Sequence, residues 1–189
     1  MNPKRLFRSR CGGQSLVEFT LVGIPLIFVL ISVFEISRGM WIYHTLAYSV
    51  KAGVRYASVH GHNCDPAVNG NNCLVNMGPV SNQCNGNTSV ADVIRCAAVG
   101  LDPAKTQIKF YTFTQGNAKT LQGSCFLDTC SGSATPFPPT GANQPGLDRI
   151  EIDITTPFNS ALAMLWPGSS PVSFASGTLG ATSADGIQF

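Results

Sequence analysis

Residues 16–34 read LVEFTLVGIPLIFVLISVF, an almost entirely apolar run of nineteen residues. A helix of this length spans about 28 Å at ~1.5 Å per residue, close to the hydrocarbon thickness of a bilayer. Residues 1–13 hold four basic side chains and no acidic one. Because basic residues tend to stay on the cytoplasmic side, the run is predicted to be a membrane anchor with its N-terminus in the cytoplasm.

Two other interpretations of this run are weaker. A cleaved secretory signal has an apolar region of only ~7–15 residues and a small-residue cleavage site after it, whereas a helical pattern follows this run. A lipoprotein signal needs a cysteine after the apolar run, and Cys11 precedes it. A signal anchor is therefore favoured.

The anchor contains one carboxylate, that of Glu18. A carboxylate inside the hydrocarbon costs on the order of 2.5–3.5 kcal/mol on insertion scales, and far less at the headgroup level. If a peptidase cut after Gly13, Gln14 would carry a new amino group one helical turn from Glu18. The two charges would then neutralise each other, within one subunit or between neighbours. A headgroup-level position for Glu18 is the alternative.

Residues 13–18, GQSLVE, have the G-x-x-x-x-E spacing of a type IV prepilin processing site. Residues 12–59 resemble the TadE-like family, pseudopilin-like proteins of the tight-adherence (Flp, type IVc) pilus machinery. The matching elements are Gly13 to Phe19, Pro25, Glu35 to Arg38 and Ala52 to Ala57. The resemblance implies processing at Gly13 and Gln14 with Glu18. It also implies helix packing or assembly contacts at Glu18, Pro25, Glu35, Arg38 and Arg55.

The helical pattern continues beyond the anchor, so residues 14–60 are expected to form one long helix with a membrane part (16–34) and an outer amphipathic part (35–59). Pro25 should kink it. Glu35 and Arg38, one turn apart, should form an ion pair. An apolar stripe recurs at spacings of four and three, at Ile36, Met40, Tyr43, Ala47, Val50, Val54 and Ala57. For Ala47 to Ala57 we favour packing on the protein's own core, and for the membrane half packing between subunits.

Residues 61–189 are expected to form an extracytoplasmic domain. A long Asn-rich loop over residues 62–87 precedes a short helix, Val90 to Ala98, which Thr88 or Ser89 can cap. Alternating apolar residues predict strands at Thr106–Thr114 and Asp148–Thr155, with Glu151 and Asp153 on a wet face. Pro171–Thr178, anchored by Val172 and Phe174, is a third candidate strand, and Gly123–Gly146 is predicted to be an exposed excursion. The fold class is α+β: a long helix packed on a small antiparallel sheet, which also resembles the general plan of pilins.

Six of the seven cysteines follow the anchor, and Cys11 lies in the basic leader, residues 1–13. An even number outside the membrane predicts three disulfides in an oxidising compartment. Six cysteines allow fifteen connectivities, of which we choose sequential pairing, with Cys125–Cys130 first. The cysteines involved are Cys64, Cys73, Cys84, Cys96, Cys125 and Cys130.

The charge balance argues against a nucleic-acid partner. The net charge is +2, and from Gln14 onward eight basic residues face ten acidic ones. No hydrolase, phosphate-binding or zinc-protease motif occurs, so neither an enzyme nor a cofactor is expected. His60, His62 and Cys64 have metal-ligand spacing, but Cys64 fits a disulfide better, so no metal is expected.

These observations together predict a minor pseudopilin-like subunit or assembly factor of a tight-adherence pilus. It would be anchored in the inner membrane and processed by a prepilin peptidase. Its further partners would be other pilins or pseudopilins and the inner-membrane assembly platform, and membrane lipid would surround the anchor. The alternative is a membrane-tethered extracytoplasmic binding or adhesion module that does not enter a pilus. An anchored periplasmic enzyme ranks third.

Overall fold

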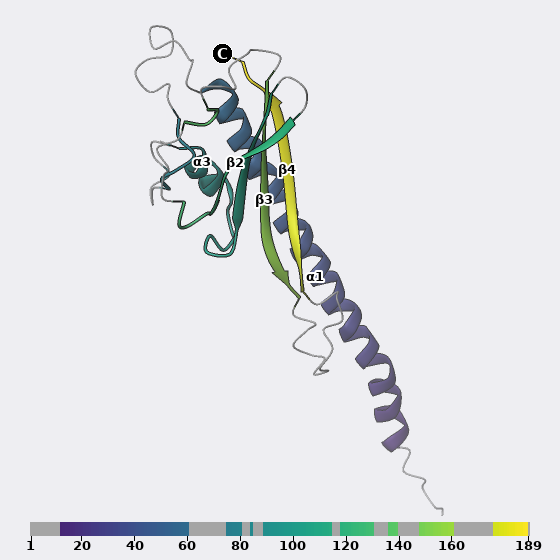
Figure 1. Ribbon diagram of the computed structural model, residues 1–189. Coiled ribbons are helices and arrows are strands. Elements are labelled where there is room, and N and C mark those ends of the chain that lie inside the picture. The colour runs from purple at the N-terminus through teal and green to yellow at the C-terminus, as the bar shows by residue number, and fades with distance from the viewer. Residues whose placement is uncertain are drawn as a thin grey trace, which may run out of the picture. The chain divides into compact units, whose positions relative to one another are not determined.

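The computed structural model describes residues 12–60, 75–80, 84, 89–114, 118–130, 136–139, 148–160 and 176–188. The chain divides into two compact units, residues 1–38 and 39–189. The described elements are α1 (Gly12–Val59), α3 (Val90–Ala97), β1 (Gln107–Thr114), β2 (Ala118–Phe126), β3 (Arg149–Asn159) and β4 (Ser176–Gly186) (Figure 1). The predicted α+β class is confirmed.

The first unit is described from Gly12 to Arg38, the inner half of α1. The helix continues through Pro25 and begins two residues earlier than predicted. Its hydroxyl groups bond to carbonyl oxygens of the preceding turn: Thr20 Oγ1 to Val17 at 2.9 Å and Ser32 Oγ to Phe28 at 2.8 Å. Such internal bonds allow serine and threonine to lie in an apolar helix, because the bonded hydroxyl groups have an acceptor within the helix.

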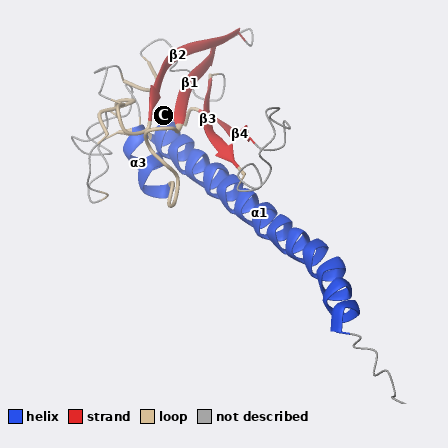
Figure 2. Cartoon of the chain, turned by 90° about the horizontal axis from the view of Figure 1, so that it is seen from below, coloured by secondary structure: helices blue, strands red, loops and turns tan. Residues whose placement is uncertain are grey.

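The second unit contains a four-stranded antiparallel sheet in the order β2-β1-β3-β4. Its strands gather on one side of the outer half of α1 (Figure 2). Cross-strand pairs such as Ile108 with Ile154 and Phe110 with Ile152 point to the same face, and all four side chains are fully buried. These residues and the outer half of α1 form one core. Alternation in β1 and β3 therefore produces the single buried face that the sequence predicted.

The outer half of α1 buries a slightly different face from the predicted stripe. Val50, Val54 and Ala57 are buried, which confirms core packing for them. Leu46, outside the stripe, is buried as well, whereas Met40 and Tyr43 are about half exposed. The reason is helical phase: a stripe at 3.5 residues per turn drifts by ~20° per heptad around an α-helix. The stripe therefore leaves the core face as it approaches Met40.

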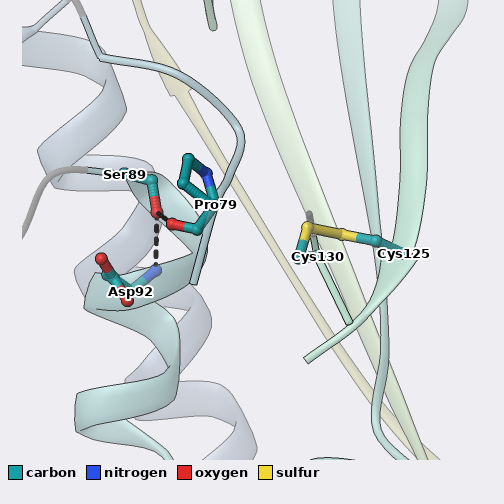
Figure 3. The surroundings of a disulfide bond; sticks show 5 residues. All are labelled: Pro79, Ser89, Asp92, Cys125 and Cys130. Atoms are coloured by element: carbon teal, nitrogen blue, oxygen red, sulfur yellow. Dashed lines mark hydrogen bonds between the residues drawn. A yellow bond between two sulfur atoms is a disulfide. The ribbon is translucent and has the colours of Figure 1, made fainter. Parts of the chain in front are cut away.

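Helix α3 begins where the sequence predicted, with Ser89 as its N-cap. The Asp92 N–H donates to Ser89 Oγ at 3.1 Å, and Ser89 Oγ donates to the carbonyl oxygen of Pro79 at 2.7 Å (Figure 3). The cap thus joins α3 to the segment before it. After α3, Gly100 adopts φ +83°, a left-handed conformation that favours glycine.

Gly53 lets α3 approach α1 closely. A Cβ at Gly53 would lie 2.4 Å from Ile94 Cγ1, well inside van der Waals contact, whereas a Cβ at Gly39 would meet Phe158 at an ordinary 3.7 Å. Gly53→Ala should therefore lower the free energy of unfolding by about 1–2 kcal/mol, because overpacking outweighs the helix propensity gained.

Gly39→Ala on the same helix provides the matched control and should be neutral or stabilising by up to about 1 kcal/mol. Denaturant unfolding of the detergent-solubilised chain measures both values. Equal stabilisation by the two substitutions would show that α3 does not pack against Gly53 as described.

One prediction for the sheet is wrong. Part of the predicted excursion Gly123–Gly146 is ordered: β2 extends into it as far as Phe126, and Leu127 and Phe137 are buried in the core. Edge-to-face packing of Phe137 on Phe110, with ring centroids 5.1 Å apart, is a long-range contact that composition alone did not predict.

The predicted strand Pro171–Thr178 is described only at its end, where it is confirmed. Most of the candidate, including Val172 and Phe174, falls outside the described residues. Strand β4 overlaps the candidate only at 176–178 and continues to Gly186. Its sequence, SGTLGATSADG, lacks the alternation of large apolar and polar residues that predicts a strand. Cross-strand pairing with β3 stabilises the strand instead.

Two disulfides occur among the described cysteines, Cys84–Cys96 and Cys125–Cys130. Both belong to the predicted sequential scheme, and Cys64 and Cys73 lie outside the described residues. Cys125–Cys130 closes the turn after β2 (Figure 3), and the carbonyl oxygen of Cys130 accepts from the Val80 N–H at 3.0 Å. Cys84–Cys96 ties the preceding loop to α3. One bridge therefore closes the turn after β2, and the other links Cys84 to α3.

Candidate assembly site on the first helix

Helix α1 provides the candidate membrane segment. Of the helices that the structure describes, it is the one long and apolar enough to cross a bilayer, and none of its most apolar window is buried inside the protein. Leu16, Phe19 and Leu21, for example, are all more than six-tenths exposed. Such a surface needs lipid or the apolar helices of other subunits around it.

The structure brings Gln14 and Glu18 together at the start of this segment. Gln14 Nε2 donates to Glu18 Oε1 at 3.3 Å, one helical turn away. A Cβ added at Gly13 would meet nothing within 4 Å. Gly13 is thus unobstructed by the described part of the chain. Glu18 lies within reach of groups on the residue that would become the new N-terminus.

At the end of the inner half of α1, Glu35 and Arg38 form the predicted ion pair. Arg38 Nη1 lies 3.7 Å from Glu35 Oε1. The Glu35 side chain is only 13% exposed, and its Oε2 is buried without a hydrogen-bond partner among the described residues. A carboxylate in this state is costly unless a further donor reaches it. Glu35 therefore belongs among the candidate assembly residues.

Arg55 lies on the exposed face of the outer half of α1. Trp41 and Tyr48 precede it on the same face at intervals of seven residues, and they are 66% and 68% exposed. Residues 39–59 contain no acidic side chain. The face opposite the core is therefore aromatic and basic. Sequence analysis identified Arg55 but missed the two aromatic residues, which the seven-residue spacing could have indicated.

The outer face of the sheet carries a charge cluster that sequence analysis missed. Lys119 on β2 bonds to Glu151, lies 3.7 Å from Asp153, and places its Nζ 4.0 Å from the centre of the Tyr111 ring. The hydrogen bond to Glu151 raises the pKa of Lys119 above its usual value, with the nearby carboxylates adding to the effect. Glu151 and Asp153 are thus partly buried and paired, and the prediction of a simple wet face is wrong for them.

The candidate metal motif is only partly described. His60 Nδ1 lies 2.9 Å from the carbonyl oxygen of Tyr56, and the two rings pack with centroids 4.3 Å apart. Burial, and secondarily the Asp92 carboxylate, raises the pKa of Tyr56. His62 and Cys64 lie outside the described residues. Within the part of the chain that the structure describes, no group of three metal-ligating side chains occurs.

A long N-terminal helix packed on an antiparallel sheet defines an α+β protein, and the apolar part of that helix is consistent with a single-pass membrane or signal segment. Residues 13–55 match the model of the TadE-like protein family. No curated protein and no solved structure was found to match the chain. That family is a structural one associated with the Tad pilus machinery. The matched range begins at Gly13 and ends at Arg55 and therefore includes every candidate residue on α1.

Proposed function

We propose that the chain is a minor pseudopilin-like subunit or assembly factor of a tight-adherence pilus, cut between Gly13 and Gln14 by a prepilin peptidase. One observation carries this proposal: the TadE-like match begins at the proposed cleavage site and covers the anchor and most of the outer half of α1. If the family were defined by a membrane tether alone, its match would not need to extend beyond the anchor to the sheet-packed residues up to Arg55.

The proposed organisation follows the chain. Residues 1–13 form a basic leader that remains cytoplasmic, residues 14–60 form the long helix, and residues 61–189 form the disulfide-stapled periplasmic domain. After cleavage, the exposed apolar side chains of the inner half of α1 exchange lipid for the helices of other pilins at the inner-membrane assembly platform. Such an exchange costs little, because lipid tails and apolar side chains are similar environments.

A membrane-tethered binding or adhesion module is the alternative. The exposed aromatic and basic face formed by Trp41, Tyr48 and Arg55 favours it, because aromatic and arginine side chains are enriched at protein interfaces. A membrane-tethered module does not require cleavage at Gly13. It would bind a surface or ligand after pili have formed.

Deletion of the chain in its natural host tests the two functions. We expect the deletion strain to lose surface pili and the full-length chain to restore them, with electron microscopy as the measurement. Normal pili combined with loss of surface attachment would contradict the assembly role and favour the tethered module. The Gly39→Ala chain, which preserves the fold, serves as a complementation control.

A further inference from the structure

Cleavage after Gly13 would place a glutamine, Gln14, at the new N-terminus. An N-terminal glutamine carries an α-amino group and a side-chain carboxamide on the same residue. The neutral amine can attack Cδ of that carboxamide and close a five-membered ring. The N–Cδ bond forms, the Cδ–Nε2 bond breaks, and Nε2 leaves as ammonia with a proton from the amine. The product is pyroglutamate, which has no basic amino group, and the reaction needs no co-reactant.

Loss of the amino group would change the charge of the processed helix. Residues 14–37 contain no lysine, arginine or histidine, and the four basic residues that precede Arg38 all lie in the leader that cleavage would remove. The α-amine would therefore be the one cationic group of the mature chain in this range. Cyclisation would leave Glu18 without that cation, and an unneutralised carboxylate in an apolar segment is costly.

The structure shows the Gln14 carboxamide bound to Glu18. Gln14 Nε2 donates to Glu18 Oε1 at 3.3 Å, one helical turn along α1. Residues 13–20 are all exposed, so neither side chain of the pair is buried by the described part of the protein. The group that cyclisation would consume is thus held by a carboxylate.

We propose that Glu18 protects the new N-terminus: its carboxylate holds the Gln14 carboxamide and keeps Gln14 from cyclising to pyroglutamate. This inference rests on the proposed cleavage after Gly13. It goes beyond that cleavage, because it identifies Gln14 as a latent modification site and Glu18 as the positioning residue that controls it.

Three chemical effects of a carboxylate at this place slow ring closure. First, the carboxamide must fold back over its own amine, and the hydrogen bond to Glu18 competes with that conformer; charge-assisted hydrogen bonds are roughly twice as strong as neutral ones. Second, the attacking amine must be neutral, whereas a nearby carboxylate favours the protonated amine. Third, the departing Nε2 must gain a proton, and an ionised carboxylate can only accept a hydrogen bond.

The mass of the mature chain, followed over time, tests the protection. Wild-type and Glu18→Ala chains are extracted from membranes of the natural host and incubated in detergent at neutral pH. We expect the wild type to keep the mass of residues 14–189, and Glu18→Ala to lose one ammonia per molecule at least about fivefold faster. Fragmentation of the N-terminal peptide locates the loss. Equal rates would overturn the protection, and slower loss from Glu18→Ala would overturn it by showing that the carboxylate promotes ring closure.

Two variants serve as controls for the chemistry. Glu18→Gln keeps an oxygen that can accept from Gln14 Nε2 but has no charge, so its rate should lie between those of the wild type and Glu18→Ala. A Glu18→Gln rate below that of the wild type would contradict a protective carboxylate. Gln14→Met, added to the Glu18→Ala chain, removes the carboxamide and should abolish the loss of ammonia. Persistent loss from this double variant would place the reaction at another residue and overturn the inference.

A further chain separates this inference from the proposed function. In it, a site for a sequence-specific protease replaces the leader directly before Gln14, so treatment of the purified protein exposes Gln14 without a prepilin peptidase. We expect the same rate difference between the versions with and without Glu18→Ala. That difference, combined with a natural mature chain that begins at Met1, would support the protective contact and contradict the proposed processing. Natural cleavage before Gln14 without a rate difference would contradict the protective contact alone.

Discussion

Replacing Glu18 by alanine is expected to abolish surface pili while the protein still inserts, is cleaved and forms its disulfides. Glu18 and Gln14 share one helical turn, with side chains 3.3 Å apart. After cleavage, the carboxylate would neutralise the amino group of Gln14 on the same chain or on a neighbour. An unneutralised charge in hydrocarbon costs on the order of 2.5–3.5 kcal/mol. Docking of the processed helix should therefore weaken by roughly a hundredfold.

Pili counted by electron microscopy give the result, and intact mass reports cleavage in the same cells. Leu21→Ala is a matched control, because Leu21 is an exposed apolar residue about one turn away and carries no charge. Membrane insertion of the uncleaved Glu18→Ala chain should be at least as strong as that of the wild type, since the insertion penalty of the carboxylate disappears. Normal piliation with normal processing would mean that Glu18 lies at the headgroup level and has no part in docking.

Gly13→Leu is expected to leave residues 1–13 attached to every molecule. A Cβ at residue 13 would meet nothing within 4 Å in the described protein, so the substitution should disturb the peptidase and not the fold. Intact mass would show the full-length chain, including Cys11, and pili should be absent. Gly23→Ala is the matched control within the same helix, where a new Cβ meets only Phe19 at 3.9 Å. Cleavage of Gly13→Leu at the wild-type extent would place the processing site elsewhere.

The features that the sequence predicted correctly depend on local geometry. The Glu35–Arg38 pair and the Ser89 cap follow from spacings within one helical turn, and β3 follows from strict alternation of isoleucines. Strand β4 could not be predicted in the same way. Its glycine, serine and threonine residues have no period of their own, and its conformation depends on eleven pairings with a strand about 27 positions earlier.

The contacts of the candidate site show the same difference between local and long-range geometry. Gln14 and Glu18 were paired from sequence because four residues make one turn. Lys119 and Glu151 are 32 positions apart and meet only through the registers of β2, β1 and β3. The prediction that the apolar stripe on α1 is buried is wrong towards Met40, because the period of the stripe differs slightly from that of the helix. Patterns thus identify elements and contacts within them, whereas contacts between elements require the assembled sheet.

The N-terminal sequence of the mature protein, extracted from membranes of its natural host, tests the central claim most directly. Cleavage by a prepilin peptidase predicts a chain that begins at Gln14, lacks Cys11 and retains Glu18 one turn from its new amino group. A mature protein that still begins at Met1 would contradict the proposed pseudopilin role.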